Sequence, residues 1–422
     1  MNTFLEELQW RGMLQDMTPN LKEHLASGKR KAYIGFDPTA PSLTIGNYVP
    51  IMLLTLFQRA GHQPVVLMGG ATGRIGDPSG KDAERQLKSY EELDRNTRFQ
   101  EVQMKKLLNF EEGDNRALLV NNLDFYRGMN VLDFLRDVGK TLTVNYMMSK
   151  ESVQTRLKTG LSFTEFSYQL LQGYDFLKLY QEHGVTIQMG GSDQWGNITT
   201  GTEFIRKKMG GEAYALTAPL LTKADGKKFG KSESGNIWLD PQRTSPYQFY
   251  QFWINADDRD LPKYLRYFSL KNRREIEELE KEHADNPRAL KVILAEELTT
   301  RIHGREAYKA VQKVSALLFN HRLQREELLQ MPEDILQQVA REIPQYKIPT
   351  ESLHTGIPLD ELLTQTGILS SKSEVRRNLQ ALSINKQKFS SHQELISNQH
   401  LLHQRYLLIE KGKKNKFVIL AE

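Results

Sequence analysis

The clearest pattern of apolar and polar positions in this chain lies between Lys31 and Gly61, in KAYIGFDPTAPSLTIGNYVPIMLLTLFQRAG. Residues 33–36 form a short apolar run typical of a strand, and the DPTAPS that follows is typical of a turn. From Asn47 onward, apolar residues recur at helical spacing as far as Gly61. The N-terminus of such a helix directs free amide groups above the sheet, which suits a phosphate, and Gly46 permits the close approach of a nucleobase. A strand followed by a helix occurs in every α/β domain, so this segment alone does not specify a function.

The second half of the chain carries three further patterns. Residues 261–325 are rich in Glu, Lys, Arg and Leu at helical spacing, as in RREIEELEKE, and predict a helical bundle. Residues 326–354 contain three prolines, and we expect them to form a linker. Within residues 355–422, IPLDELLTQTGILSSKSEVRRNLQALSINKQKF predicts a helix, a turn, a second helix and a strand.

Composition excludes several classes of protein. A chain of 422 residues predicts two or three domains, and the absence of cysteine excludes disulfides and thiolate metal sites. The ten histidines show no ligand spacing such as HExxH, so we expect no metal held by the protein. The longest nearly apolar run, Tyr48 to Phe57, falls short of the ~20 residues that span a bilayer, and the N-terminus is acidic, unlike a signal peptide. We therefore expect a cytoplasmic protein.

Positive charge is distributed unevenly along the chain. The formal net charge is +5, and residues 355–422 contain ten Lys and Arg against six Asp and Glu. This excess suits RNA phosphates, but a surplus of this size also fits a solvated surface.

The segment KADGKKFGKSESG, Lys223 to Gly235, crowds lysines among glycines. Lysine ammonium groups repel one another, so a loop of this kind is suited to close on a polyanion such as a triphosphate. It does not match a Walker loop, because too few residues separate Gly226 from Gly230. Taken alone, it is more typical of a solvated basic turn.

Together, the two segments resemble the paired nucleotide motifs of the class I aminoacyl-tRNA synthetases. LTIGN stands at the place of the HIGH motif and KFGKS at the place of the KMSKS motif. Five further segments, in the same order as in the family, resemble the bacterial tyrosyl-tRNA synthetases: GGATGRIGDPSGKDAER, VNYMMSKESV, SFTEFSYQLLQGYDF, GGSDQWGNI and SPYQFYQFWIN. The resemblance is dense over residues 30–260 and looser beyond them.

The resemblance implies an α/β architecture. We expect a Rossmann-like nucleotide-binding catalytic domain over residues 1–250, interrupted around 121–182 by an insertion that in the family forms much of a homodimer interface. A helical domain over 251–325, the linker over 326–354 and a small α+β RNA-binding domain over 355–422 follow. Lys372, Arg376 and Arg377 on the second helix of that last domain are the expected RNA-binding residues. The family's Val-Asn-Gly turn after this helix has no counterpart here, because residues 383–386 contain no glycine.

The implied reaction joins L-tyrosine to ATP and then transfers the tyrosyl group to tRNA(Tyr). Tyr33 and Asp175 match the residues that hydrogen-bond the phenol hydroxyl of tyrosine, a pair left unpaired if phenylalanine entered. The residues that match those around the substrate ammonium and carboxylate are Asp77, Tyr168, Gln172 and Gln194. Tyr168 and Gln172, four apart, would share one face of a helix. Three of these residues also have an ordinary structural explanation: a strand aromatic for Tyr33, a helix cap for Asp175 and a turn for Asp77.

The expected ATP site is larger. Its residues are Gly35, Asp37, Gly46, Gly191, Asp193, Leu221, Lys231 and Ser232, with Asp193 accepting hydrogen bonds from the ribose. The expected catalytic groups, which orient and neutralise phosphates and form no covalent bond, are Thr39, Thr44, Asn47, Lys81, Arg85, Lys228 and Lys231. We expect Mg²⁺ to arrive with ATP.

One position departs from the family in a way that affects the chemistry. Both histidines of HIGH are replaced, by Thr44 and Asn47, and the first of them normally donates to the γ-phosphate. Loss of one such donor costs about 10²-fold or more in rate where nothing compensates. Two alternatives therefore stay open: a divergent duplicate acting on a related amino acid such as D-tyrosine, or a noncatalytic RNA-binding descendant.

Overall fold

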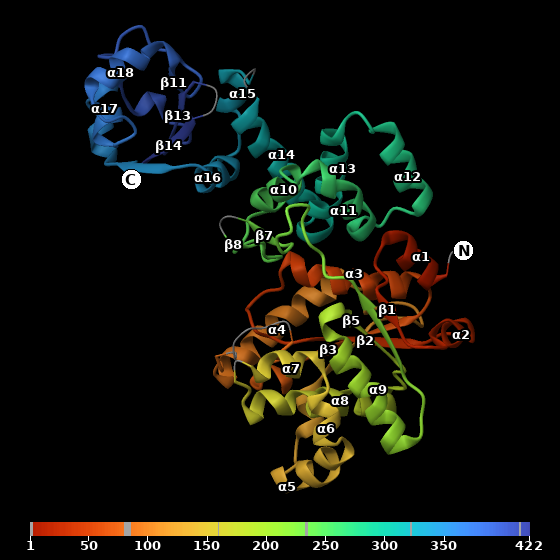
Figure 1. Ribbon diagram of the computed structural model, residues 1–422. Helices are drawn as coiled ribbons and strands as arrows, with labels where there is room; N and C mark the ends of the chain where they lie inside the picture. The colour runs from red at the N-terminus through yellow and green to blue at the C-terminus, as the bar shows by residue number, and fades with distance from the viewer. Residues whose placement is uncertain (1–2, 80–85, 159, 233–234, 321–322, 413–414) are drawn as a thin grey trace. The chain divides into compact units, whose positions relative to one another are not determined.

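The computed structural model describes residues 3–79, 86–158, 160–232, 235–320, 323–412 and 415–422 (Figure 1). The chain divides into two compact units. The first unit comprises residues 1–245 with 251–302, and the second comprises 246–250 with 303–422.

The first unit is built on a six-stranded sheet of order β1-β6-β5-β2-β3-β4. Its strands are β1 (Asp16–Met17), β2 (Lys31–Phe36), β3 (Gln63–Met68), β4 (Leu118–Asn121), β5 (Ile187–Gly191) and β6 (Tyr214–Ala218). All neighbours pair in parallel except β1 with β6. Every residue of β3 is buried, as expected for a parallel strand covered on both faces. From β2 the chain continues to β3 and β4 on one side of the sheet, and then to β5 and β6 on the other side. The strand order therefore reverses between β2 and β5. The expected Rossmann-like architecture is confirmed.

Helices cover both faces of this sheet. In Figure 1, α3 (Ile45–Arg59) lies on one face and α9 (Trp195–Met209) on the other. The first unit also contains α1 (Phe4–Arg11), α2 (Leu21–Ala26), η1 (Thr72–Arg74), α4 (Tyr90–Leu107), α8 (Phe163–His183), η5 (Ser192–Gln194), β7 (Lys231–Ser232), β8 (Gly235–Asn236), η6 (Asp258–Asp260), α11 (Leu261–Phe268) and α12 (Arg273–Glu282). α10 (Pro246–Ile254) and α13 (Pro287–His303) cross the boundary between the units.

Two glycines set how closely α8 and α9 pack. A Cβ built on Gly173 of α8 would come within 2.9 Å of Phe204, and one built on Gly201 of α9 within 2.8 Å of Phe176. Each helix thus receives an aromatic ring of the other in a notch that has no side chain. This packing fixes the position of α8, which carries several of the expected site residues.

The expected insertion lies between β4 and β5. It contains η2 (Asn122–Tyr126), α5 (Val131–Asp133), the π-helix η3 (Phe134–Val138), η4 (Gly139–Thr141), α6 (Val144–Met148), α7 (Glu151–Leu157) and α8. Arg156 and Glu165 form a buried ion pair within it at 2.9 Å. Several apolar side chains of the insertion are exposed, Leu132 by 72% and Phe163 by 73%.

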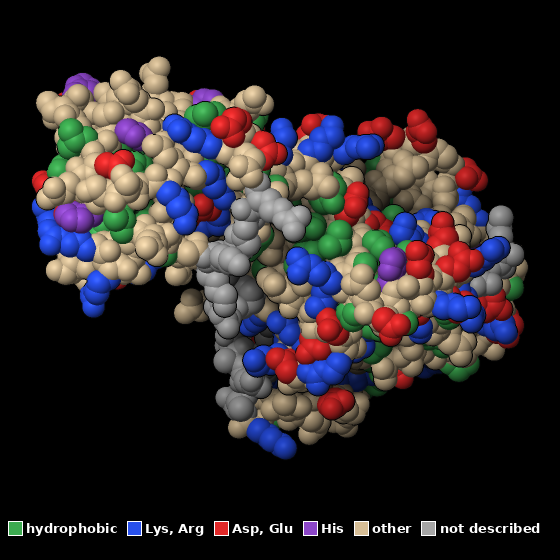
Figure 2. Space-filling model, turned by 90° about the horizontal axis from the view of Figure 1, so that it is seen from above, with side chains coloured by type: hydrophobic (Ala, Val, Ile, Leu, Met, Phe, Trp, Pro, Cys, Tyr) green, Lys and Arg blue, Asp and Glu red, His purple; other side chains and the backbone are tan. Residues whose placement is uncertain are grey.

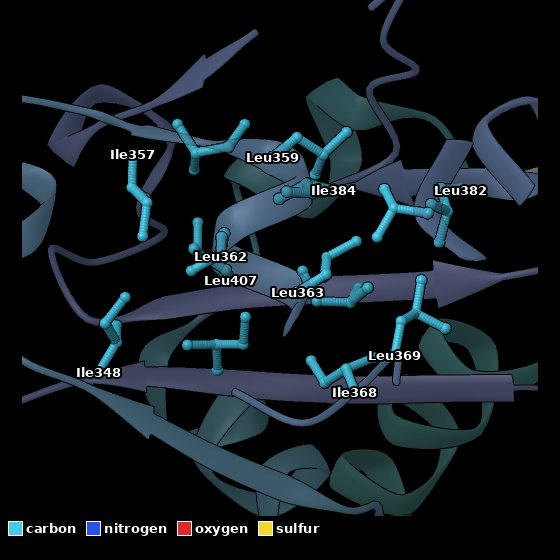
Figure 3. Close-up of a cluster of buried hydrophobic side chains, with 14 of the residues drawn as sticks. Ile348, Ile357, Leu359, Leu362, Leu363, Ile368, Leu369, Leu382, Ile384 and Leu407 are labelled. Atoms are coloured by element: carbon cyan, nitrogen blue, oxygen red, sulfur yellow. The ribbon is translucent and has the colours of Figure 1, made fainter. Parts of the chain in front are cut away.

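The second unit is a four-stranded sheet covered by helices. The sheet has the order β11-β13-β14-β9, in β11 (Leu382–Ile384), β13 (Tyr406–Lys411), β14 (Asn415–Ala421) and β9 (Gln345–Ile348). The remaining elements are α14 (Arg305–Phe319), α15 (Arg325–Leu329), α16 (Glu333–Glu342), η7 (Thr350–Leu353), β10 (Ile357–Pro358), α17 (Leu359–Gln365), α18 (Lys372–Asn378), η8 (Leu379–Ala381), β12 (Leu395–Ile396) and η9 (Asn398–His400). One buried core joins α17 and α18 to the sheet, and Figure 3 shows Leu362 and Leu363 beside Leu407 of β13. A second core joins α14 and α16 to residues such as Leu408 of β13.

The segment 326–354, expected to form a linker, instead contains α16 and β9. Leu336 and Val339 of α16 are buried in the second core, and β9 pairs in parallel with β14. The prolines punctuate short elements: Pro332 is the N-cap of α16, and Pro344 precedes β9. The helical stretch 251–325 is likewise divided, since α11 and α12 belong to the first unit and α14 to the second.

The turn after β11 closes without glycine. Asn385 and Lys386 adopt positive φ angles of 49° and 67°. The Asn385 side chain stabilises this conformation, because its Oδ1 accepts from the Leu408 amide at 2.7 Å and its Nδ2 donates to the His400 carbonyl. The expected helix, turn, helix and strand are confirmed, and asparagine replaces glycine in the turn.

Candidate active site

A cavity of about 850 Å³ opens where the strand order reverses. Loops after β2 and β5 line it, which is where doubly wound sheets bind ligands. The expected site residues that line it are Tyr33, Gly35, Asp37, Thr39, Thr44, Gly46, Asn47, Asp77, Tyr168, Gln172, Asp175, Gly191, Asp193, Gln194, Leu221, Lys228 and Lys231. Lys81 and Arg85 lie outside the described residues, as does the side chain of Ser232.

The buried end of the cavity holds a carboxyl group between two donors. Asp175 on α8 accepts from Asn122 Nδ2 and from the Tyr126 hydroxyl, each at 2.8 Å. Burial raises the pKa of Asp175 to about 7, while these two hydrogen bonds oppose the rise. The Tyr33 hydroxyl is buried with no hydrogen-bond partner among the described residues, and burial together with the charge of Asp175 raises its pKa. A donor and an acceptor are therefore available to a ligand at this end.

A chain of hydrogen bonds fixes this end to the tip of β2. Asn122 Nδ2 also donates to Thr72 Oγ1 at 2.9 Å, and Thr72 Oγ1 donates to Asp37 Oδ1 at 2.6 Å. The Tyr168 hydroxyl donates to the other oxygen of Asp37 at 3.0 Å, which returns the chain to α8. Asn122 thus links the carboxyl groups of Asp175 and Asp37.

A second buried carboxyl group, that of Asp77, lies beside the start of α9. Asp77 accepts from Gln194 Nε2 at 2.7 Å, from Asn197 Nδ2 at 3.3 Å and from the Ser79 amide at 2.9 Å. Gln172 nearby in the lining has a buried Oε1 for which the described residues offer no partner. Buried acceptors of this kind are costly in an empty protein and suit a cationic or donor-rich ligand.

The replaced HIGH positions form a helix cap. Thr44 is the N-cap of α3, and its Oγ1 accepts from the backbone amide of Asn47 at 3.4 Å. In return, Asn47 Oδ1 accepts from the Thr44 amide at 2.9 Å and from its hydroxyl at 2.8 Å. Since Oδ1 is committed to the cap, Asn47 offers its amide Nδ2 to the cavity. The two side chains form a capping box at the end of α3 that suits an anion.

The lysine-rich segment folds back directly onto this helix end. A Cβ built on Gly230 would lie 3.1 Å from Ile45 Cγ2 and 3.2 Å from the Gly46 amide nitrogen. Ile45 N donates to the Ile237 carbonyl at 2.8 Å, and Ile237 N donates to that of Gly230 at 3.1 Å. The two segments that resemble signature motifs therefore share one structure at the mouth of the cavity.

Phe229 anchors this segment in an aromatic cluster. Its ring lies 5.2 Å from that of Tyr264, 5.3 Å from Phe268 and 6.1 Å from Trp253, between centroids. The flanking lysines, Lys228 among them, are exposed. The arrangement holds one side of the segment and leaves its cations free to approach a ligand.

Asp193 and Lys228 bring charges of both signs to the lining of the cavity. Burial raises the pKa of Asp193, with a contribution from the charge of Asp77, and the charge of Lys228 opposes this rise. Figure 2 shows Lys and Arg interspersed with Asp and Glu on the outer face it presents.

In the second unit, the expected RNA-binding residues Lys372, Arg376 and Arg377 are exposed on α18.

Several site residues were missed from the sequence. Asn122, Tyr126 and Thr72 position the acidic groups, and Gln188 on β5 presents a buried Oε1 that has no partner among the described residues. Asn122 directly follows the apolar strand β4, at the carboxyl edge of the sheet, and this position was a usable signal. The sequence around Tyr126 offers no comparable signal.

The described residues contain no grouping of metal ligands and no membrane-spanning helix. None of their His, Asp or Glu side chains gather into a group of three that could hold a metal ion. No helix in the described part of the chain has the length and apolar character needed to cross a membrane.

Two family models match the chain. The model described as tRNA synthetases class I (W and Y) matches residues 26–320, and the Tyrosine--tRNA ligase SYY-like C-terminal domain matches 334–419. Among curated relatives, the Tyrosine--tRNA ligase of Porphyromonas gingivalis is 52% identical, over 99% of this chain and 100% of the relative. That of Cytophaga hutchinsonii is also 52% identical, over 99% of both chains.

Solved structures of tyrosyl-tRNA synthetases resemble this chain as well. A C-terminally truncated mitochondrial tyrosyl-tRNA synthetase of Aspergillus nidulans superposes with a TM-score of 0.68 at 29% identity, over 76% of this chain and 95% of that one. Tyrosyl-tRNA synthetase of Archaeoglobus fulgidus, solved with L-tyrosine, superposes with a TM-score of 0.54 at 18% identity, over 73% of this chain and 99% of that one. This match shows a shared fold.

Proposed function

Since this chain belongs to the class I tRNA synthetases of the tryptophan and tyrosine group, we propose that it activates L-tyrosine with ATP and transfers the tyrosyl group to the 3′ end of tRNA(Tyr). The observation that carries the choice of tyrosine is the pair at the buried end of the cavity. Tyr33 presents a hydroxyl with no partner among the described residues, and Asp175 lies at the same end. A phenol donates to Asp175 and accepts from Tyr33. Phenylalanine leaves the Tyr33 hydroxyl without a partner and makes no hydrogen bond to Asp175.

The rest of the amino acid fits the cluster on α8 and α9. The ammonium group donates to Asp77, to the unpartnered Oε1 of Gln172 and to the Tyr168 hydroxyl. Gln194 Nε2 donates to Asp77 at 2.7 Å, and we assign this side chain to the substrate carboxylate. This arrangement directs the substrate carboxylate toward the mouth of the cavity.

ATP occupies the mouth. Asp193 accepts from the ribose, the backbone at Gly46 and Gly191 leaves room for the nucleoside, and Leu221 contributes an apolar surface. Thr39, Asn47 and the N-terminus of α3 donate to the phosphates. The remaining residues assigned to ATP are Gly35, Asp37, Ser232, Lys81 and Arg85.

The reaction needs orientation and positive charge. A carboxylate oxygen of tyrosine attacks the α-phosphorus, the bond from that phosphorus to the bridging oxygen breaks, and pyrophosphate leaves. Lys228 and Lys231 neutralise the charge that develops on pyrophosphate. Mg²⁺ enters with ATP, because phosphate oxygens and water are its preferred ligands. The ribose hydroxyl of the terminal adenosine of the tRNA then attacks the tyrosyl carbonyl and releases AMP.

Thr44 has a different role from the residue it replaces. Its hydroxyl donates to Asn47 at 2.8 Å, so it stabilises the helix end in place of reaching the γ-phosphate. The side-chain amide of Asn47 and the positive end of the α3 dipole act at this position instead, which supports an active enzyme over a noncatalytic descendant.

The proposed assembly is a cytoplasmic homodimer. The exposed apolar side chains of the insertion, Val131, Leu132, Val144 and Phe163 among them, support an interface there, because such side chains gain from burial. Lys372, Arg376 and Arg377 on α18 are proposed to contact tRNA phosphates.

The direct test is aminoacylation. Purified protein is incubated with ATP, Mg²⁺, labelled L-tyrosine and bacterial tRNA, and acid-precipitable label is counted. We expect label that mild alkali releases, as from an ester. Absence of label from a protein that also fails to exchange pyrophosphate would overturn the proposal.

A further inference from the structure

Three carboxamide side chains on one face of α4 contact the loop that joins β2 to α3. Asn96, Gln100 and Gln103 follow one another at spacings of four and three, so they share one side of the helix. The loop, residues 37–44, carries Thr39 and Thr44, which line the cavity. The proposed function assigns α4 no part in binding or in chemistry.

Two of the carboxamides bind backbone carbonyls of the loop. Asn96 Nδ2 donates to the Pro38 carbonyl at 3.1 Å, and Gln100 Nε2 donates to the Ala40 carbonyl at 2.7 Å. Asn96 and Gln100 are 0% and 3% exposed. The reverse orientation of either amide would oppose two oxygens, so the contacts themselves specify which atom donates.

The third carboxamide closes the row at the start of α3. Gln103 Oε1 accepts from the Leu43 amide at 2.9 Å, and its Nε2 donates to Ser42 Oγ at 2.9 Å. Leu43 directly precedes the N-cap Thr44. The row therefore follows the loop from its first residues to the helix that it introduces.

This row carries a cost in free energy. The oxygens of Asn96 and Gln100 are buried and have no partner among the described residues. Apolar side chains there would avoid these two unsatisfied acceptors but would remove the donors to the Pro38 and Ala40 carbonyls, so the carboxamides are retained at a cost for what they do to the loop. Gln100 also lines the cavity.

We propose that Asn96, Gln100 and Gln103 are positioning residues for the phosphate end of the active site. They hold the loop so that Thr39 and the N-terminus of α3 meet the triphosphate in the geometry of the adenylation reaction. This inference rests on the proposed function. Because misplacement of a binding group by about 1 Å costs on the order of 10²-fold in rate, a loop that loses one of these hydrogen bonds loses activity without losing the fold.

The test compares Gln100→Met and Gln103→Met with Thr97→Val. Methionine keeps the length of glutamine and removes its donor. Thr97 lies buried on the same helix, and its hydroxyl donates to the Leu93 carbonyl within the helix, at 2.8 Å. The control therefore loses a buried hydrogen bond of α4 that does not reach the loop.

The readout is kcat and KM in ATP–pyrophosphate exchange, with melting temperature measured alongside. We expect each methionine variant to lower kcat by about 10- to 100-fold at unchanged KM for tyrosine, and Thr97→Val to keep the kcat of the wild-type protein. Gln103 is only half-buried, so its variant carries the test if Gln100→Met does not fold.

Two results overturn the inference. One is wild-type kcat in the methionine variants, and the other is a loss that Thr97→Val reproduces at an equal melting temperature. Absence of exchange by the wild-type protein is distinct from both, because it overturns the proposed function and this inference with it.

Discussion

Gly230 of the lysine-rich segment lies against Gly46 at the start of α3, so closely that a Cβ on Gly230 would come 3.2 Å from the Gly46 amide nitrogen. The φ angle of Gly230 is +88°, a conformation that side chains disfavour. This contact holds the exposed lysines of one segment above the helix end formed by the other. The geometry of the mouth therefore depends on a position with no side chain.

Gly230→Ala should lower exchange activity by about 10-fold or more, because the added methyl forces the lysine segment away from α3. Gly226→Ala is the matched comparison. Its φ is +80°, yet a Cβ there meets no described atom within 4 Å. Equal losses of activity in the two variants would show that backbone strain, and not the contact, is responsible.

Tyr33→Phe should have opposite effects on stability and on activity. Removing a buried hydroxyl that has no partner among the described residues relieves a penalty of about 1–3 kcal/mol, so the variant should be at least as stable as the wild type. The same change should raise KM for tyrosine by about 10-fold. Urea unfolding and exchange kinetics measure the two effects.

Tyr126→Phe is the control for that prediction. Its hydroxyl donates to Asp175 at 2.8 Å, so its removal should lower the free energy of unfolding by about 1 kcal/mol. A Tyr33→Phe protein that is destabilised as much as Tyr126→Phe would contradict the assignment of a free hydroxyl at Tyr33.

Asp175 should make stability depend on pH in the direction opposite to most carboxyl groups. Burial raises its pKa from 3.8 to about 7, so between these values the folded state binds more protons than the unfolded state. The free energy of unfolding therefore falls as pH rises through this window. Asp175→Asn removes the proton site, and the melting temperature of the wild type relative to this variant should fall from about pH 5 to pH 8. A flat difference would contradict the raised pKa.

Thr44→Ala should cost about 1 kcal/mol of stability, because Thr44 caps α3. Thr3→Ala is a matched control, since Thr3 forms the same kind of capping box at α1 and does not line the cavity. We expect similar losses of stability in urea unfolding, but a reduced exchange rate only in Thr44→Ala. An unchanged exchange rate in Thr44→Ala would show that the end of α3 does not position the phosphates.

Local patterns predicted the parts of the fold that depend on neighbours in the chain. The strand and helix of residues 31–61 occur as β2 and α3, with α3 beginning at Ile45 because Thr44 caps it. The TIGN segment was interpreted as the loss of a donor, although a threonine three residues before an asparagine also allows a cap. The prolines of 326–354 predicted a linker, because a proline that begins a helix looks the same in sequence as one that prevents it.

The network around Asp175 could be predicted only in part. Asn122 and Tyr126 reach Asp175 from another element, and such contacts depend on the packing of α8, which the notches at Gly173 and Gly201 determine. Neither notch leaves a local signal, because a glycine inside a helix marks close packing only when the facing residue is known.

The measurement that tests the central claim most directly is amino-acid-dependent ATP–pyrophosphate exchange by the purified wild-type protein. L-tyrosine, L-phenylalanine, L-tryptophan and D-tyrosine are supplied in parallel. The account predicts exchange with L-tyrosine and little or none with L-phenylalanine, because Tyr33 and Asp175 would face an empty position. Exchange with phenylalanine as fast as with tyrosine, or no exchange with any of the four by a folded protein, would contradict it.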